Sequence, residues 1–228
     1  MDIEDVNIYD ENNILFQESF NALRENIKFC CTSQRDIRTI AITSCSPREG
    51  KTTVAINFAI SLAKSGFNVI LIDGDLRKSR IKKKLSNGCQ EGITSYVRHG
   101  CAIERIICKS NIRNLDYISS GYDSSNASGI IASPKIRDLF FNLREKYDYV
   151  IVDTPSLGSV IDGSVIAAMT DGTILVLESK ASNREVLDRA ILQLKNADAK
   201  MLGVVVNRIN KVKYMKYCRY YKEILASK

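Results

Sequence analysis

Residues 43–53 decide the fold, and they read Thr43-Ser44-Cys45-Ser46-Pro47-Arg48-Glu49-Gly50-Lys51-Thr52-Thr53. A short apolar run at 40–42 precedes them, and Gly66 stands downstream where a helix C-cap is expected. Between the two, apolar residues recur at the offsets of one helix face: Ala55, Phe58, Ala59 and Leu62. A strand, a turn and a helix that begins with Gly-Lys-Thr form the context that a phosphate-binding loop requires.

This loop contains the residue types that phosphate binding needs. A helix N-terminus and consecutive backbone N–H groups attract anionic oxygens. Gly50 lets the backbone approach them, Lys51 can reach the terminal phosphates, and the Thr52 hydroxyl can bind Mg²⁺. The residues expected to contact a nucleotide here are Ser46, Pro47, Arg48, Glu49, Gly50, Lys51, Thr52 and Thr53.

The motif is imperfect, because Cys45 occupies the place of the first glycine in G-x-x-x-x-G-K-[ST]. Gly-Lys-Thr also occurs by chance in many chains. An ordinary strand-to-helix turn therefore remains the alternative, and the other motifs of the chain must decide.

Strands and helices alternate along the rest of the chain. Apolar runs predict strands at 68–72, 115–119, 149–153, 173–177 and 203–207. Helices are expected at about 14–31, at 134–146 behind an N-cap at Ser133, near 160–169, and through Leu194 behind a capping box of Ser182 and Glu185. Residues 78–112 suggest only a helix or two, and 120–128 a loop. This pattern predicts an α/β protein with a doubly wound, mostly parallel sheet in one domain, 1–228.

Composition limits the classes of function. The chain has 228 residues, a net charge of +7 and one histidine, His99, so sites built on several histidines are excluded. Seven cysteines form no C-x-x-C pair, which predicts reduced thiols. No apolar run approaches the ~20 residues of a membrane span, and the acidic N-terminus is no signal peptide, so a cytoplasmic protein is expected. Basic clusters at 77–84 and 211–222 fit a solvated face, nucleic acid, a membrane or an acidic partner.

Carboxylates follow two of the predicted strands. Asp73 and Asp75 come directly after 68–72, and Asp153 ends 149–153. Ligands of such sheets bind outside the carboxyl ends of the strands. We expect Thr52, Asp73 and Asp153 to organise Mg²⁺, and Asp73, supported by Asp75, to accept a proton from an attacking hydroxyl. Arg77 can stabilise phosphate charge or pair with a carboxylate to brace the loop.

In combination, three of these segments resemble a known family. The segment from Ile70 to Arg77 resembles the Walker A′ motif of bacterial protein-tyrosine kinases, Ser46 to Thr53 their Walker A, and Val150 to Pro155 their Walker B. These kinases are of the CpsD or CapB type in capsular and exopolysaccharide assembly, and are related to the MinD and ParA ATPases. The resemblance runs from about Phe16 to Tyr221 and implies ATP, Mg²⁺ and catalysis by Lys51, Asp73 and Asp75. It also places Asn207 near the adenine and matches an aspartate at Asp162.

A tyrosine cluster follows the last predicted strand, at Tyr214, Tyr217, Tyr220 and Tyr221, interleaved with basic residues. Such alternation also suits nucleic-acid stacking or a tail packed on a helix face. In the family that the chain resembles, a tail tyrosine cluster is the site of autophosphorylation. The resemblance therefore implies a flexible, phosphorylated tail at about 211–228, and no nucleic acid is expected as a partner.

The chain departs from the family pattern at several positions. Arg48 stands where many relatives have a second glycine, and Ser46 where MinD-like loops have a signature lysine. The Glu-x-x-Arg-x-x-Arg motif of the oligomerisation helix reads Glu18-x-x-Asn21-x-x-Arg24 here. Glu18 and Arg24 remain the expected oligomerisation residues of a helix at about 14–31.

The sequence thus predicts an ATP-dependent tyrosine kinase that phosphorylates its own tail in trans and regulates polysaccharide synthesis or export. The resemblance implies a homo-oligomer, a cognate tyrosine phosphatase, and a membrane adaptor of the polysaccharide co-polymerase type that recruits the protein to the inner membrane face. Two alternatives stay open: a MinD- or ParA-like ATPase, and a non-catalytic protein that binds nucleotide as a structural ligand.

Overall fold

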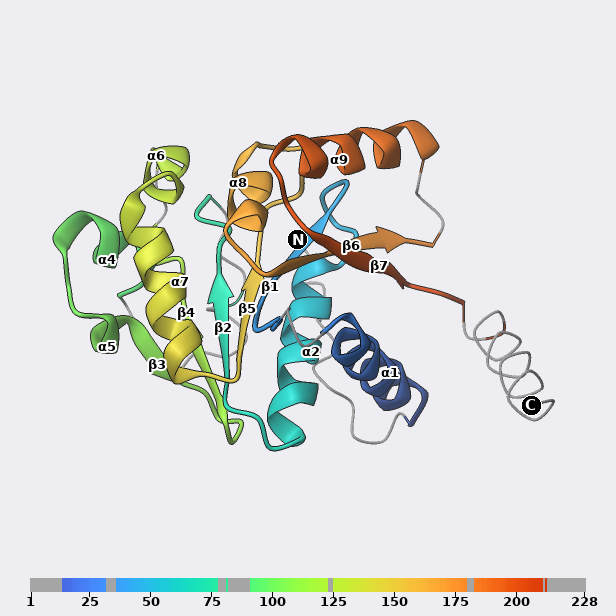
Figure 1. Cartoon of the computed structure of the whole chain (residues 1–228), viewed down its shortest axis with the longest axis horizontal. Coiled ribbons are helices and arrows are strands. Elements are labelled where there is room, and N and C mark those ends of the chain that lie inside the picture. Colours follow the sequence, from blue (N-terminus) through green and yellow to red (C-terminus); the bar gives the residue numbers. More distant parts are fainter. Residues whose placement is uncertain are drawn as a thin grey trace, which may run out of the picture.

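The computed structural model describes residues 14–31, 36–77, 81, 91–122, 125–179, 183–210 and 212. Seven strands and the surrounding helices make up this part of the chain (Figure 1). In chain order the elements are α1 (Ile14–Cys30), β1 (Thr39–Ser44), α2 (Lys51–Lys64), β2 (Val69–Asp73), α4 (Ile93–His99), α5 (Ile103–Ile106), β3 (Ile107–Lys109), β4 (Leu115–Ile118), α6 (Ala127–Ile131), α7 (Pro134–Lys146), β5 (Tyr149–Asp153), α8 (Asp162–Ala168), β6 (Gly172–Glu178), α9 (Arg184–Asn196) and β7 (Met201–Asn207).

The strands form one sheet in the order β3-β4-β2-β5-β1-β6-β7. All neighbouring pairs are parallel except β3 and β4. β1 therefore lies between β5 and β6, and β2 lies beside β5. This confirms the predicted α/β class with a mostly parallel sheet.

Helices cover both faces of the sheet (Figure 1). On one face α2 packs directly on the strands, and α1 packs outside it, with Phe20 and Ile27 joining the same apolar cluster. On the other face α4, α6 and α7 contribute to one cluster, and α9 contributes Ala190 and Leu194 to another. Strands covered on both faces read as continuous apolar runs, which explains the composition of β2 and β5.

Helix α2 is the most enclosed helix of the described chain, with 12 buried residues from Lys51 to Ala63. Gly66 ends it as predicted, because it adopts a φ of +93°. Its N–H donates to Ala63 O (3.0 Å) and the Phe67 N–H to Leu62 O (3.4 Å), the pair of bonds that satisfies the last carbonyls of a helix. This termination turns the chain directly into β2.

Some boundaries differ from the prediction. Asn183, not Ser182, precedes α9, and its side chain accepts the Glu185 N–H; Ser182 itself lies outside the described residues. The predicted loop at 120–128 ends in α6, which Asn126 caps. The irregular stretch also contains β3, whose three residues pair antiparallel with β4 and are too few to give a periodic signal.

Cysteine chemistry is mixed in the described residues. Cys30, Cys31, Cys45 and Cys101 are free thiols. Cys108 on β3 is disulfide-bonded, so the expectation of reduced thiols is wrong for this residue.

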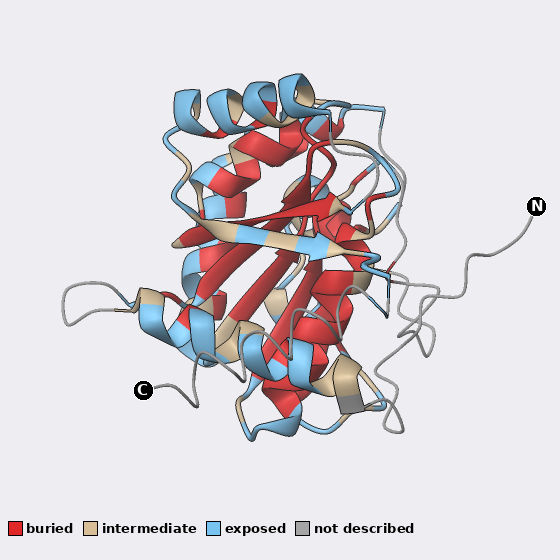
Figure 2. Ribbon diagram, turned by 90° about the vertical axis from the view of Figure 1, so that its right-hand side faces the viewer, coloured by how far each residue is buried: buried red, intermediate tan, exposed pale blue. Residues whose placement is uncertain are grey.

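Strand β7 is one of the two edge strands of the sheet. In Figure 2 it is banded in the colours of intermediate and exposed residues, whereas the strands behind it are buried. Met201, Val204 and Val206 are 43%, 44% and 48% exposed. An exposed apolar edge of this kind can pair with another strand.

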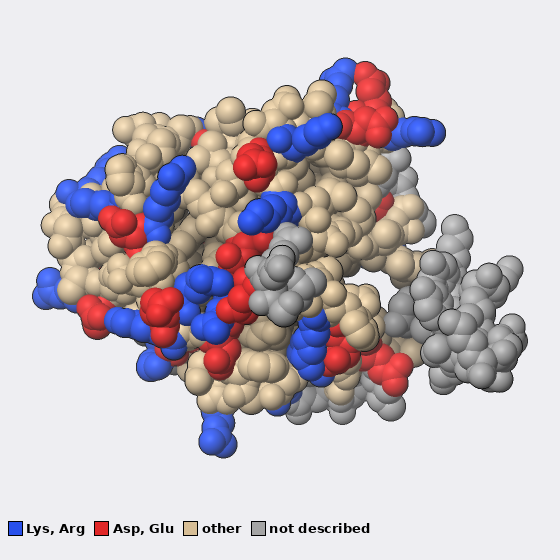
Figure 3. Space-filling model, viewed as in Figure 1, with Lys and Arg blue, Asp and Glu red and all other residues tan. Residues whose placement is uncertain are grey.

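The charged surface is mixed. Acidic and basic side chains lie interspersed over the face seen in Figure 3. Most of the two basic clusters predicted at 77–84 and 211–222 lies outside the described residues. No helix in the described part of the chain is both long and apolar enough to cross a membrane.

Candidate active site

The predicted site residues meet at the carboxyl edge of the sheet. β1 leads into the loop before α2, while β2 ends in Asp73 and β5 in Asp153. Asp73 and Asp153 are register partners on neighbouring strands. The topology thus brings together two carboxylates and a helix N-terminus that are far apart in the sequence, at the edge where such sheets bind ligands.

The loop at 45–50 is held by bonds from its own residues and from β7. Glu49 is buried, and its Oε2 accepts the Ser46 N–H at 2.8 Å. The Asn207 side chain donates from Nδ2 to the Glu49 carbonyl at 2.9 Å. Asn207 therefore fixes the loop from the end of a strand that lies beyond β6. Contact between Asn207 and an adenine ring stays a prediction.

Two loop residues adopt left-handed backbone conformations. Gly50 precedes α2 with a φ of +90°, and Arg48 has a φ of +69°. This conformation raises the free energy of a residue with a Cβ by about 1–2 kcal/mol, whereas glycine adopts it with almost no steric cost. The backbone at 48 thus has a conformation that favours glycine, although an exposed arginine occupies the position. The Cys45 side chain, in contrast, is buried in an apolar cluster that includes Leu157 and Leu175.

The Cys45 thiol stays neutral. Burial, with a smaller contribution from the nearby Glu49 carboxylate, raises the pKa of Cys45 to about 11. A thiol with this pKa is almost entirely protonated at neutral pH, and the thiolate is the nucleophilic form. Cys45 therefore serves as a small apolar residue of a buried cluster.

Gly50→Ala tests the loop geometry. A Cβ at this position would lie 2.0 Å from Asn207 Nδ2, so either the side chain of Asn207 or the loop must move. We expect nucleotide affinity to fall by about tenfold or more, since the loop N–H groups would lose their alignment. Titration with a fluorescent ATP analogue measures this loss.

Gly66→Ala is the matched control for Gly50→Ala. Gly66 has a similar φ of +93°, but nothing lies within 4 Å of its added Cβ. It should lower stability by about 1–2 kcal/mol and leave nucleotide affinity unchanged. Equal affinities of the Gly50→Ala variant and the native protein would contradict the assigned role of the loop.

Lys51 and Thr52 join the loop to the carboxylates. Thr52 Oγ1 donates to Asp153 Oδ2 at 2.7 Å. Lys51 Nζ lies 3.6 Å from Asp153 Oδ1 and 3.9 Å from Asp75 Oδ2. Lys51 is buried, and its positive charge offsets the negative charges of these two carboxylates, which lie close together in a site with little solvent.

Asp153 is almost fully buried, at 1% exposure. Burial raises the pKa of this carboxyl group, and the Lys51 charge and the Thr52 hydrogen bond oppose that rise. Its Oδ1 is a buried oxygen without a hydrogen-bond partner. A carboxylate oxygen that accepts no hydrogen bond, beside a threonine hydroxyl, belongs to the oxygen donors that Mg²⁺ prefers, so these residues fit the ion.

A metal site built from protein alone is absent from the described ranges. No group of three or more His, Cys, Asp and Glu side chains in these ranges could hold an ion. Mg²⁺ commonly uses one or two carboxylates and completes its coordination with substrate phosphates and water. The arrangement at Thr52 and Asp153 agrees with that mode of binding.

The other two carboxylates differ in access. Asp73 is fully buried, and it accepts the N–H groups of Asp75 and Ile81, each at 3.3 Å. The Asp75 side chain is 16% exposed, and its Oδ2 lies 3.9 Å from Lys51 Nζ. The assignment of Asp73 as the base stays a prediction, and Asp75 is the more accessible of the two.

Arg77 pairs with Asp162, a carboxylate that does not follow a strand. Its Nε donates to Asp162 Oδ2 at 3.0 Å and one NH₂ group to Ser128 Oγ at 2.9 Å. The sequence suggested an arginine that pairs with a carboxylate, but local spacing could not identify a partner on α8. A contact of Arg77 with phosphate stays a prediction.

The remaining predicted residues lie away from the loop or outside the described chain. Arg24 on α1 donates to Ser61 Oγ of α2 at 2.9 Å, whereas Glu18 is exposed. Tyr214, Tyr217, Tyr220 and Tyr221 lie outside the described residues. The roles of Glu18 and Arg24 in oligomerisation and of the tyrosines in phosphorylation stay predictions.

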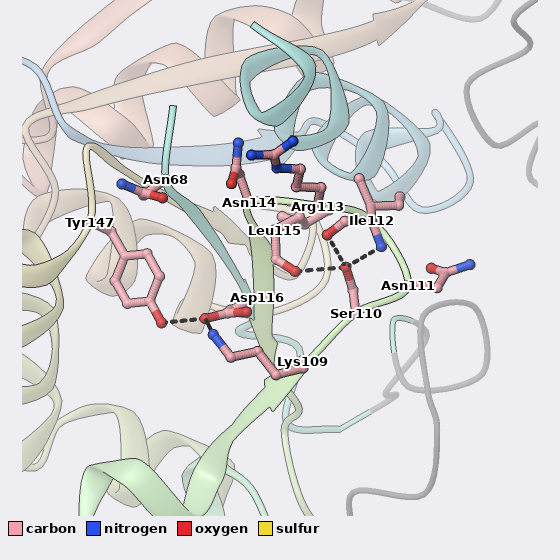
Figure 4. A pocket seen from close by; sticks show the side chains of 10 residues that line it. All are labelled: Asn68, Lys109, Ser110, Asn111, Ile112, Arg113, Asn114, Leu115, Asp116 and Tyr147. Atoms are coloured by element: carbon pink, nitrogen blue, oxygen red, sulfur yellow. Dashed lines mark hydrogen bonds and ion pairs between the residues drawn. The ribbon is translucent and has the colours of Figure 1, made fainter. Parts of the chain in front are cut away.

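A polar pocket lies at the opposite, amino edge of the sheet (Figure 4). There Asp116 Oδ2 accepts from Tyr147 Oη and Lys109 Nζ, both at 2.7 Å. Burial and the Asp116 carboxylate raise the pKa of Tyr147, so its hydroxyl stays protonated. Asn68 and Leu115 line this pocket near the beginnings of β2 and β4, which separates it from the site at Lys51.

The chain is similar to known proteins over most of its length. A family model described as an AAA domain matches residues 37–205. The tyrosine-protein kinase CpsD of Streptococcus pneumoniae serotype 4 is 35% identical over 200 residues, which cover 85% of this chain and 85% of that protein.

Solved structures agree with the fold. The chimerical protein CapA2B2 superposes with a TM-score of 0.84 at 28% identity and covers 92% of both chains. The cell division ATPase MinD of Pyrococcus furiosus superposes with a TM-score of 0.66 at 24% identity, over 76% of this chain and 73% of that chain. This second likeness concerns the fold alone.

Proposed function

The chain belongs to the family of bacterial tyrosine-protein kinases that includes CpsD, and we propose that it transfers the terminal phosphoryl group of ATP to tyrosine. The observation that carries the proposal is the cluster at the carboxyl edge of the sheet. There Lys51 lies within 4 Å of both Asp75 and Asp153, at the start of a helix whose N–H groups can bind phosphates. Phosphoryl transfer relies on this kind of positioning and charge neutralisation.

In the proposed reaction the tyrosine oxygen forms a bond to the terminal phosphorus of ATP. The bond between that phosphorus and its bridging oxygen breaks, and ADP leaves. Lys51 and the loop N–H groups hold the phosphates, and Asp73 or Asp75 accepts the proton of the hydroxyl. A tyrosine hydroxyl titrates near ~10, so the carboxylate acts mainly by orienting it and accepting the proton late.

Mg²⁺ would be held by Thr52 and Asp153, with Asp73 as the register neighbour of Asp153. When bound there, the ion would neutralise the negative charge of the phosphates during transfer. Thr52 and Asp153 have two further roles. Thr52 orients Asp153 through the hydrogen bond of 2.7 Å, and burial of both side chains keeps bulk water away.

The acceptor that we propose is the tyrosine cluster at 214–221, on a second copy of the chain. Four tyrosines in that stretch lie among basic residues, and phosphorylation would convert the stretch toward neutral or negative charge. On α1, the exposed Glu18 and Phe29 offer a surface for contact between copies, with Phe29 83% exposed. The wider proposal adds a membrane adaptor, a phosphatase and a role in polysaccharide synthesis or export.

Replacing all four tail tyrosines by Phe tests the acceptor. We expect most of the label from radioactive ATP to disappear, while ATP affinity stays within about twofold, because the substitutions change none of the residues proposed to hold the phosphates. To test transfer in trans, a Lys51→Met copy with an intact tail is mixed with an active copy that lacks the tail tyrosines. Label on the Lys51→Met copy supports transfer between subunits.

The same assay separates the alternatives. ATP hydrolysis without phosphotyrosine would favour a MinD-like ATPase. Tight ATP binding without hydrolysis or label, with and without the cytoplasmic segment of an adaptor, would favour a non-catalytic protein.

A further inference from the structure

A three-residue bridge lies beside the candidate site and joins three elements of the fold. Arg77, at the end of the loop after β2, donates to Asp162 Oδ2 at 3.0 Å. It also donates to Ser128 Oγ of α6 at 2.9 Å, and that hydroxyl donates to Asp162 Oδ1 at 2.6 Å. Each member therefore contacts the other two.

The bridge is anchored on its buried member. The Asp162 side chain is 1% exposed, and each of its oxygens accepts a hydrogen bond from the bridge. Arg77 is 41% exposed in its side chain, and Ser128 is exposed. A buried carboxylate must keep charged or polar partners, so Asp162 holds Arg77 strongly in this place.

The loop between β2 and Arg77 is held at both ends. At its beginning the Gly74 N–H donates to Asp153 O at 2.8 Å, and the Asp75 N–H donates to Asp73 Oδ1. At its far end the bridge fixes Arg77. Asp75 lies between these two anchors, with Oδ2 at 3.9 Å from Lys51 Nζ.

We propose that Asp162 and Ser128 are positioning residues for phosphoryl transfer, and that they act through Arg77 to hold Asp75 in line with Lys51. This inference rests on the proposed kinase activity. Neither residue needs to contact ATP or tyrosine. A small displacement of a reacting group lowers the rate of a positioned reaction, while affinity for the nucleotide is set elsewhere, in the loop.

Ser128→Ala is the most informative variant, because it removes both hydroxyl bonds and leaves Asp162 paired with Arg77. We expect kcat for phosphotyrosine formation to fall by about tenfold, with KM for ATP within about twofold of the native value. Ser128→Thr keeps the hydroxyl and should restore kcat. Ser159→Ala is the matched control, because Ser159 is also exposed but its hydroxyl bonds Ser156.

The coupling to Asp75 is tested in a double variant. If the bridge acts through Asp75, adding Ser128→Ala to Asp75→Asn should lower the residual kcat no further. Unfolding temperatures of all variants are measured beside the rates. A role in stability alone would lower the unfolding temperature and leave kcat at native values when assayed well below it.

The activity of the native protein distinguishes failure of the kinase proposal from failure of the positioning role. Absence of phosphotyrosine in the native protein would overturn the kinase proposal itself. Normal native activity together with native kcat in Ser128→Ala, or a full tenfold loss in the Asp75→Asn background, would overturn the positioning role and leave the kinase proposal standing.

Discussion

Replacing Lys51 by Met is expected to lower phosphotyrosine formation by about three orders of magnitude. Lys51 Nζ is the cation shared by Asp153, at 3.6 Å, and Asp75, at 3.9 Å. Methionine has a similar length and no charge, so the variant removes the counter-charge of both carboxylates and of the phosphates. Phosphoryl transfer has little covalent assistance from the protein, so loss of such a charge should lower its rate strongly.

The measurement is the initial rate of label transfer from ATP in the presence of Mg²⁺, with Lys64→Met as the control. Lys64 is the last residue of the same helix and is exposed, at the opposite end from the loop. The control should retain the native rate. Substantial label in the Lys51→Met variant would exclude the proposed mechanism.

Asp153→Asn is expected to separate activity from stability. The amide cannot replace the carboxylate that would hold Mg²⁺, and we expect a loss of about two to four orders of magnitude in rate. The same substitution removes a buried charge whose ionised form burial disfavours. The unfolding temperature at neutral pH should therefore rise, by about 2–4 °C if the gain is near 1 kcal/mol.

The sign of the pH dependence follows from the raised pKa. The folded protein binds a proton at Asp153 more tightly than the unfolded chain does, because in the unfolded chain the pKa of this carboxyl group has its ordinary value of ~3.9. The contribution of this group to stability is thus fully present below that value and is lost as pH rises through the raised pKa. The advantage of Asp153→Asn over the native protein should grow with pH, and calorimetry at several pH values measures it. A lower unfolding temperature for the variant at neutral pH would contradict this account.

The chemistry of the site could be predicted from short segments of sequence. Gly50, Lys51 and Thr52 stand together, and Asp73 and Asp153 each end an apolar run. Parallel strands have their carboxyl ends at the same edge of the sheet, so the predicted fold class already implied that Asp73 and Asp153 lie near each other. The structure confirms this part of the prediction in the register pair of Asp73 and Asp153.

Contacts between distant elements could not be predicted in the same way. The bond from Asn207 to the Glu49 carbonyl depends on where β7 lies, and the bridge from Arg77 to Asp162 depends on how α8 faces the loop after β2. No periodicity or local spacing encodes either distance. The left-handed conformation of Arg48 could not be predicted from the sequence either, because an arginine does not indicate a positive φ.

The strand order has a consequence for how the protein becomes functional as it folds. β1 and β2 are made early, but each pairs with β5, so that Val69 meets Tyr149 across a long intervening segment. Parallel pairings of high sequence separation form slowly, because loop closure precedes the gain from contact. During synthesis the phosphate loop therefore emerges well before the strand that supplies Asp153. Nucleotide binding then becomes a property of the finished sheet, and it stabilises only chains that have completed it.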